Sequence, residues 1–207
     1  MHNPEDLFEG YRRFKSGDYA RQAALYEKLG HGQDPDIMVI GCADSRADPG
    51  DIFDAAPGQL FVIRNVANLV PPYQPDGKLH GVSAALEFAV TALKVKHVVV
   101  MGHGGCGGVS ASLSAADDKP VGQFIAPWVS LLDSPRDAVL SENPDDPQTA
   151  LEHRGIGASI ENLMSFPFVS DAVASGALRL HGAWFASGQG ELHWRDAETG
   201  IFDVVDS

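Results

Sequence analysis

The chain is poor in cysteine and in positive charge, and it has no long apolar segment. Its 207 residues include two cysteines, and 15 lysines and arginines face 28 aspartates and glutamates, for a net charge of −13. Binding to nucleic acid or to anionic membranes depends on clustered basic residues, so the charge balance argues against both. Even the apolar run Val98 to Met101 is far too short to span a bilayer. We therefore expect neither nucleic acid nor membrane as a partner.

The first ten residues carry Glu5, Asp6 and Glu9 and no apolar centre, so they do not resemble a secretory signal peptide. The expected location is therefore the cytoplasm. In a reducing compartment a disulfide between Cys42 and Cys106 is not expected. The two thiols consequently need a different role.

The pattern of apolar residues predicts one α/β domain. Hydrophobic residues make up 44% of the chain and charged residues 21%, as in soluble globular proteins. A helical pattern is expected over Leu79 to Leu93, and a mostly helical stretch over 122–168. Strands are expected at Ile37 to Gly41, Leu60 to Ile63, His97 to Met101, Ala177 to Phe185, Glu191 to Arg195 and Phe202 to Val205. Strands that alternate with helical crossovers predict a mostly parallel central sheet flanked by helices.

The first 30 residues predict two helices, the first with Leu7, Tyr11 and Phe14 on one face and the second from Tyr19 to Leu29. No repeat, low-complexity tract or linker follows them. We therefore divide the chain into an N-terminal helical arm, residues 1–30, and a single domain, residues 31–207.

Two polar clusters directly follow expected strands. Cys42 begins the segment 42–46 after the first strand, while His103 and Cys106 lie in a glycine-rich turn after the third. Ligands of such sheets collect at the carboxyl ends of the strands. Two thiolates and an imidazole are suitable zinc ligands, and a set of three leaves the fourth position open for chemistry. If the two strands are neighbours, the sequence predicts a catalytic zinc site.

The same turn carries a competing pattern. Gly102-x-Gly104-x-x-Gly107 matches the dinucleotide-binding fingerprint, and it follows an expected strand. That fingerprint also needs a second strand that ends in an acidic residue about 20 positions further on. The corresponding stretch, Gly122 to Trp128, contains neither an acid nor a strand pattern. We therefore reject the nucleotide interpretation.

At these residues the chain resembles the β-class carbonic anhydrases. The matching motifs are Cys42-x-Asp44-Ser45-Arg46 and His103-x-x-Cys106, and similarity extends over roughly residues 30 to 205. The resemblance implies a carbonic anhydrase (carbonate dehydratase, a zinc lyase). It implies Zn²⁺ on Cys42, His103 and Cys106, with carbon dioxide, bicarbonate and water as reactants and metal-bound hydroxide as nucleophile.

The resemblance also gives Asp44 and Arg46 catalytic roles. Asp44 can accept a hydrogen bond from the hydroxide and aim it at carbon dioxide, while Arg46 holds Asp44 away from the metal through a bidentate pair. Two thiolates cancel the charge of the ion, so its water should ionise less readily than on a three-histidine site. We therefore expect an alkaline activity optimum, which a flat rate from pH 6 to 9 would contradict.

The substrate pocket resembles that of the plant-like, type I subtype. Gln33 precedes Cys42 by nine residues, like the glutamine that donates to substrate in that subtype, and Val39 replaces the tryptophan of the bicarbonate-inhibited subtype. The residues expected around the substrate are Gln33, Phe61, Val66, Phe88 and Gly104. Phe88 stands where tyrosine is usual, and Ala92 where plant members carry a histidine proposed as a proton relay. Turnover should therefore depend strongly on buffer concentration.

In the family, the N-terminal helices pack across a partner subunit, which implies a homodimer and allows a tetramer. Two other functions stay open. One is hydrolysis of carbonyl sulfide or carbon disulfide on the same site, although Gln33 favours carbon dioxide because it offers a donor to oxygen. The other is a non-catalytic zinc- or bicarbonate-binding module, in which Asp44 would permanently occupy the fourth metal position.

Overall fold

A six-stranded sheet forms the centre of the computed structural model, which describes residues 3–76, 78, 80–117 and 119–206. The strand order is β2-β1-β3-β4-β5-β6. The pairs β2–β1, β1–β3 and β3–β4 are parallel, whereas β5 and β6 are antiparallel to their neighbours. The expected mostly parallel sheet is therefore confirmed. The bounds are β1 Ile37–Cys42, β2 Leu60–Asn65, β3 His97–His103, β4 Arg179–Ala186, β5 Glu191–Arg195 and β6 Phe202–Val204.

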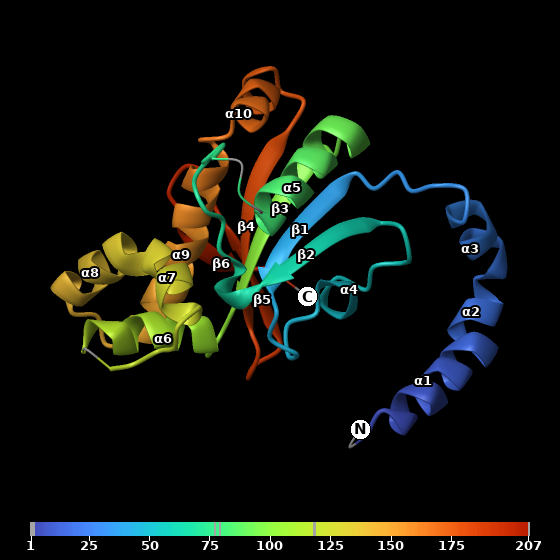
Figure 1. Cartoon of the computed structure of the whole chain (residues 1–207), viewed down its shortest axis with the longest axis horizontal. Coiled ribbons are helices and arrows are strands. Elements are labelled where there is room, and N and C mark those ends of the chain that lie inside the picture. Colours follow the sequence, from blue (N-terminus) through green and yellow to red (C-terminus); the bar gives the residue numbers. More distant parts are fainter. Residues whose placement is uncertain (1–2, 77, 79, 118, 207) are drawn as a thin grey trace.

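Helices connect the parallel strands and gather around the sheet (Figure 1). They are α4 Pro49–Ile52, α5 Gly81–Glu87, the π-helical turn η2 Phe88–Leu93, α6 Gly107–Ala116, α7 Ile125–Val129, α8 Asp133–Glu142, α9 Pro147–Leu163 and α10 Pro167–Ala174. Two short 3₁₀ turns, η1 Val66–Asn68 and η3 Ser130–Leu132, complete the set among the described residues that follow the N-terminal arm.

The helix starts follow from capping chemistry. Asp48 accepts a hydrogen bond from Gly50 N at 2.8 Å, with Pro49 in the first turn of α4. Asp146 caps α9 in the same way, with Thr149 N at 3.1 Å. The helix expected over Leu79 to Leu93 differs in detail. Leu79 lies outside the described residues, and the described helix begins at Gly81 and ends in the π-helical turn.

The central strands are buried on both faces, which explains their uninterrupted apolar sequences. On one face Met38, Ile40 and Val98 pack against α5, α9 and α10. On the other face Val39 and Val99 belong to a smaller cluster that includes side chains of α4 and β5. Together these contacts fix β1 and β3 side by side.

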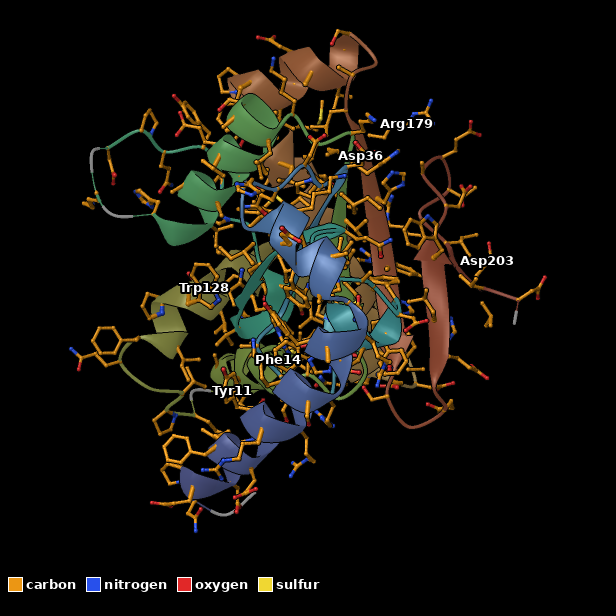
Figure 2. The ribbon with its side chains drawn as sticks, turned by 90° about the vertical axis from the view of Figure 1, so that its right-hand side faces the viewer. Tyr11, Phe14, Asp36, Trp128, Arg179 and Asp203 are labelled. Atoms are coloured by element: carbon orange, nitrogen blue, oxygen red, sulfur yellow. The ribbon has the colours of Figure 1, made fainter. Side chains whose placement is uncertain are left out.

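The first 30 residues form three helices rather than the expected two: α1 Glu5–Ser16, α2 Asp18–Arg21 and α3 Ala23–Leu29. The expected break at Gly17 is present, and a second one occurs at Gln22, whose backbone leaves the helical region. No arm residue in the described range is buried. The arm stands apart from the sheet (Figure 1), and Tyr11 and Phe14 lie along it (Figure 2).

Of the helices in the described ranges, none has the combination of length and apolar character needed to cross a membrane.

Candidate metal centre

Strand pairing brings the two polar clusters together. Because β1 and β3 are parallel neighbours, their last residues, Cys42 and His103, lie at the same edge of the sheet. The chain then turns at Gly105, whose φ of +66° suits glycine, and Cys106 caps the start of α6. This turn carries Cys106 back beside His103.

The three side chains form a compact, buried group. Their ligand atoms lie within 4.8 Å of one another, and the two Sγ atoms are 3.9 Å apart. Zn–S bonds of 2.3 Å in a tetrahedral site would place two sulfurs about 3.8 Å apart. Cys42, His103 and Cys106 are 5%, 0% and 1% exposed. The spacing and the burial fit a zinc ion.

His103 presents one ring nitrogen to the centre of this group. Its Nδ1 lies 3.1 Å from the Gly104 carbonyl oxygen and donates to it. That hydrogen bond leaves Nε2 as the acceptor, and Nε2 is buried with no hydrogen-bond partner among the described residues. A buried polar atom without a partner is costly, and coordination of a metal ion would satisfy it.

The thiols cannot both ionise without a cation between them. The hydrogen bond with Cys106 lowers the pKa of the Cys42 thiol, against the opposing effect of burial. The same contact, together with burial, raises the pKa of the Cys106 thiol. Burial lowers the pKa of His103, but contact with Cys42 outweighs it and raises that pKa overall. A divalent cation would stabilise both thiolates and the neutral imidazole at once.

The structure places Asp44 and Arg46 beside these ligands. Arg46 donates from Nε and Nη2 to the two Asp44 carboxylate oxygens at 2.9 and 2.7 Å, and from Nη2 to the Gly105 carbonyl oxygen at 3.1 Å. Asp44 Oδ2 is 3.8 Å from His103 Nε2. Hydrogen bonds from the Arg46 side chain hold the pKa of Asp44 well below its usual range. Asp44 is therefore an anion at the rim of the candidate metal site.

Sequence reasoning missed Arg64, which holds the loop after β1. Its guanidinium donates to the carbonyl oxygens of Cys42 and Asp44 at 2.8 and 2.6 Å, and to the Asp48 carboxylate at 2.6 Å. The signal was an arginine that directly follows four apolar residues in the strand Leu60–Asn65. A charged residue there needs buried acceptors, and the carbonyls of the neighbouring loop supply them.

Sequence reasoning also missed a carboxylate behind Cys106. Glu152 is 3% exposed and accepts hydrogen bonds from Cys106 N, Gln148 Nε2 and Trp184 Nε1 at 2.8, 2.7 and 3.0 Å. The signal was its position on α9, one turn before the buried Ile156. An acid on the buried face of a helix indicates a polar partner in the interior.

The expected pocket residues divide into two groups. Val66 directly follows β2, next to the first turn of α6, and Gly104 lies between two of the candidate ligands. In the pairing of β1 with β2, Asn65 lies opposite Cys42. Phe61 comes four residues before Asn65, so it lies about 13 Å along the strand from the level of Cys42. The Phe61 ring packs on the Phe88 ring, with centroids 5.8 Å apart.

Gln33 lies still further from the metal ligands of its own chain. It precedes β1, whose six residues separate it from Cys42 by about 17 Å. Asp36 and Arg179 mark this opposite end of the strands (Figure 2). Within one chain the structure therefore brings Val66 and Gly104 to the metal ligands, but not Gln33, Phe61 or Phe88.

Comparison with known proteins agrees with this geometry. Residues 37–192 match the family model described as carbonic anhydrase. Beta carbonic anhydrase 3 of Arabidopsis thaliana is 33% identical over 187 residues, which cover 87% of this chain and 72% of that protein.

Two solved structures share the fold over nearly the whole chain. The β-carbonic anhydrase CcaA has a TM-score of 0.90 and 31% identity, covering 98% of this chain and 92% of that one. Tetrameric β-carbonic anhydrases from the filamentous ascomycete Sordaria macrospora include a chain with a TM-score of 0.83 and 30% identity, covering 96% of this chain and 98% of that one.

Proposed function

The chain belongs to the β-class carbonic anhydrases, which hydrate carbon dioxide reversibly to bicarbonate and a proton, and we propose that it does so with zinc held by Cys42, His103 and Cys106. The observation that carries the proposal is the convergence of these three side chains, with His103 Nε2 left as an unsatisfied acceptor at their centre. A zinc ion held there would lower the pKa of a bound water toward neutrality.

Asp44 orients the attacking water in this proposal. Both its oxygens accept from Arg46, so the carboxylate keeps one position and stays ionised. From that position it can accept a hydrogen bond from the nucleophile and direct a lone pair toward the carbon of carbon dioxide. The same pairing restrains Asp44 from closing the site as a fourth ligand.

The catalytic unit is a homodimer or a tetramer built from it. Gln33, Phe61 and Phe88 lie away from the metal ligands of their own chain, so a second copy has to supply these groups if they line the pocket as in the plant-like subtype. The exposed apolar residues of the arm support such assembly, with Leu7, Phe8 and Tyr11 each more than half exposed. The Sordaria macrospora relatives are tetrameric.

Two further proposals follow from the sequence. The chain lacks a histidine at Ala92, so protons leave the site through buffer, and turnover rises with buffer concentration. The second proposal is a cytoplasmic location.

The non-catalytic alternative is disfavoured by the hydrogen bonds of Asp44. A closed module needs a carboxylate oxygen of Asp44 on the metal, whereas both oxygens accept from Arg46. Hydrolysis of carbonyl sulfide or carbon disulfide uses the same nucleophile and depends on the shape of the substrate channel, so it is decided by experiment.

The test is stopped-flow hydration of carbon dioxide by zinc-loaded protein at alkaline pH, followed with a pH indicator, with carbonyl sulfide and carbon disulfide assayed in parallel. We expect fast turnover of carbon dioxide that falls as the pH is lowered. Turnover of the sulfur compounds alone would replace the proposed substrate. If the protein binds zinc and turns over none of the three, the proposed function is wrong.

A further inference from the structure

Glu152 is an unusual group to find in the interior of this protein. Among the described residues it is the only acidic side chain that is fully buried, and no lysine, arginine or histidine lies within ion-pair distance of it. A carboxylate without a counter-ion is costly to bury unless hydrogen bonds replace its water. Glu152 must therefore gain its stabilisation from the three N–H groups that point at it.

Those three donors come from different parts of the fold. Gln148 precedes Glu152 by one turn of α9, Trp184 lies on β4, and the third donor is the backbone N–H of Cys106 at the start of α6. Glu152 thus joins a helix and a strand to one peptide group of the candidate metal site.

The peptide groups on both sides of Cys106 are held by this cluster. Glu152 Oε1 accepts from the Cys106 N–H at 2.8 Å, and Gln148 Nε2 donates to the Cys106 carbonyl oxygen at 3.1 Å. The Trp184 ring packs against the same turn, close to Gly104. If Gly104 carried a Cβ atom, that atom would lie 3.3 Å from Trp184 Cζ2. The backbone that sets the position of the Cys106 sulfur therefore has little freedom.

We propose that Glu152 is a positioning residue for the zinc ligand Cys106. Its carboxylate fixes the Cys106 backbone so that the sulfur stays 3.9 Å from that of Cys42, at the separation that a shared ion requires. Arg64 holds the Cys42 loop through its carbonyl oxygens, and Glu152 holds the other loop through its N–H. The inference rests on the proposed function only in assuming that these ligands bind zinc.

The test is the variant Glu152→Gln. Its amide oxygen can still accept from Cys106 N–H, but the amide NH₂ then faces the Trp184 Nε1–H, so two donors oppose each other. We expect zinc affinity to fall about 10- to 100-fold, the usual effect of losing such an outer partner. The readouts are competition with a chromophoric chelator and the sulfur-to-metal absorption of the cobalt-substituted protein.

A matched control and a rescue separate this role from general stability. Ser159→Ala removes another buried polar group of α9, one that contacts Val70 N and the Asn68 carbonyl rather than a ligand loop. We expect this control to change zinc affinity by less than about twofold. The double variant Glu152→Gln/Trp184→Phe removes the opposing donor, and we expect it to recover part of the lost affinity.

Three results would overturn the inference: zinc affinity of Glu152→Gln within twofold of the wild type, an equal loss in Ser159→Ala, or no recovery in the double variant. If Glu152→Gln does not fold, Gln148→Leu replaces it, and a zinc affinity equal to that of the wild type would count against the inference. Zinc affinity is measured without turnover. If the protein binds zinc but does not hydrate carbon dioxide, only the proposed function is wrong, and the inference about Glu152 is not affected.

Discussion

In the proposed function, Asp44 has the most demanding role of any single residue outside the candidate ligands. It must remain an anion, keep one orientation and stay off the metal, and the two hydrogen bonds from the Arg46 side chain serve all three requirements. Because Arg46 is exposed, the pair depends on its bidentate geometry more than on burial.

Asp44→Asn should lower kcat/KM for carbon dioxide about 100-fold or more while zinc content stays at the wild-type level. The amide accepts hydrogen bonds more weakly than the carboxylate, and its NH₂ group opposes Arg46. Stopped-flow kinetics with metal analysis checks this. Asp51→Asn, at an exposed acid of α4, is the control and should retain wild-type turnover. Loss of zinc together with activity in Asp44→Asn would contradict the assigned role.

A second prediction concerns how the stability of the protein depends on pH, and it rests on His153. Burial, followed by the charge of His193, lowers the pKa of His153 from 6.5 to about 4. Its Nε2 has no hydrogen-bond partner among the described residues. Between pH 6.5 and 4 the unfolded chain therefore binds a proton that the folded chain does not, and stability falls as the pH falls through this window. The loss is at most roughly 3 kcal/mol.

His153→Phe should remove that part of the acid sensitivity, because phenylalanine can keep the stacking on Phe202 without a titratable group. Urea unfolding at pH 7.5 and pH 4.5 measures it. The decrease in the free energy of unfolding should be smaller in the variant than in the wild type. A control variant at the exposed His31 should show the wild-type decrease. Equal decreases in all three proteins would contradict the prediction.

Helix α6 is positioned by a close contact between its first turn and the 3₁₀ turn η1. A Cβ on Gly108 would lie 2.6 Å from Val66 Cγ1 and 2.9 Å from Ala67 Cβ, whereas a Cβ on Gly107 would meet nothing within 4 Å. Only the absence of a side chain at Gly108 lets η1 and α6 touch. This contact also fixes Val66 beside the candidate metal site.

The two neighbouring glycines therefore form a matched pair. Gly108→Ala should destabilise the protein by about 1–3 kcal/mol through overpacking. Gly107→Ala should be neutral or stabilise it by up to about 1 kcal/mol, because alanine favours the helix. Urea unfolding of both zinc-loaded variants distinguishes them. Equal effects of the two substitutions would show that the contact with Val66 and Ala67 does not limit the approach of α6.

At the scale of elements, local sequence predicted the strands well because β1 and β3 are buried on both faces and therefore read as apolar runs. It also predicted α4 from Asp48 and Pro49, whose capping chemistry is local. The π-helical end at Phe88–Leu93 and the arm break at Gln22 were missed, since no glycine or proline marks either position. Such departures depend on how neighbouring elements pack.

The candidate site likewise contains residues that the sequence predicted and residues that it did not. Cys42, His103 and Cys106 could be predicted because each lies at or just past the end of a strand, and parallel strands end at the same edge. Glu152 and Arg64 could not be assigned, because the ligand residues that they hold, Cys106 and Cys42, lie 46 and 22 residues away in the sequence. These contacts form only when the chain folds. The far position of Gln33 follows from strand direction, since a residue before β1 lies at the edge opposite to Cys42.

At the scale of the whole molecule, the arm is the feature that a single chain leaves unexplained. Its helices carry exposed apolar side chains and no buried residue in the described range. Burial of such side chains in a partner contact would contribute roughly 1.5–3 kcal/mol each. In the proposed function a second copy also supplies Gln33, Phe61 and Phe88 to the pocket.

The double variant Leu7→Ser/Tyr11→Ser should therefore weaken self-association at least about tenfold. Glu9→Ser/Arg12→Ser alters an exposed ion pair on the same helix and should associate like the wild type. Sedimentation equilibrium measures both. A wild-type chain that stays monomeric at micromolar concentration, or an unchanged association constant in the first variant, would contradict a role for the arm in assembly.

The most direct measurement is a titration of zinc into metal-free protein while the hydration of carbon dioxide is followed, with Cys106→Ser titrated alongside. We expect turnover to rise in proportion to bound zinc and to level off at one ion per chain. Cys106→Ser should bind zinc weakly and stay near the buffer rate. Full turnover without zinc, or equal turnover by Cys106→Ser, would contradict a zinc enzyme built on Cys42, His103 and Cys106.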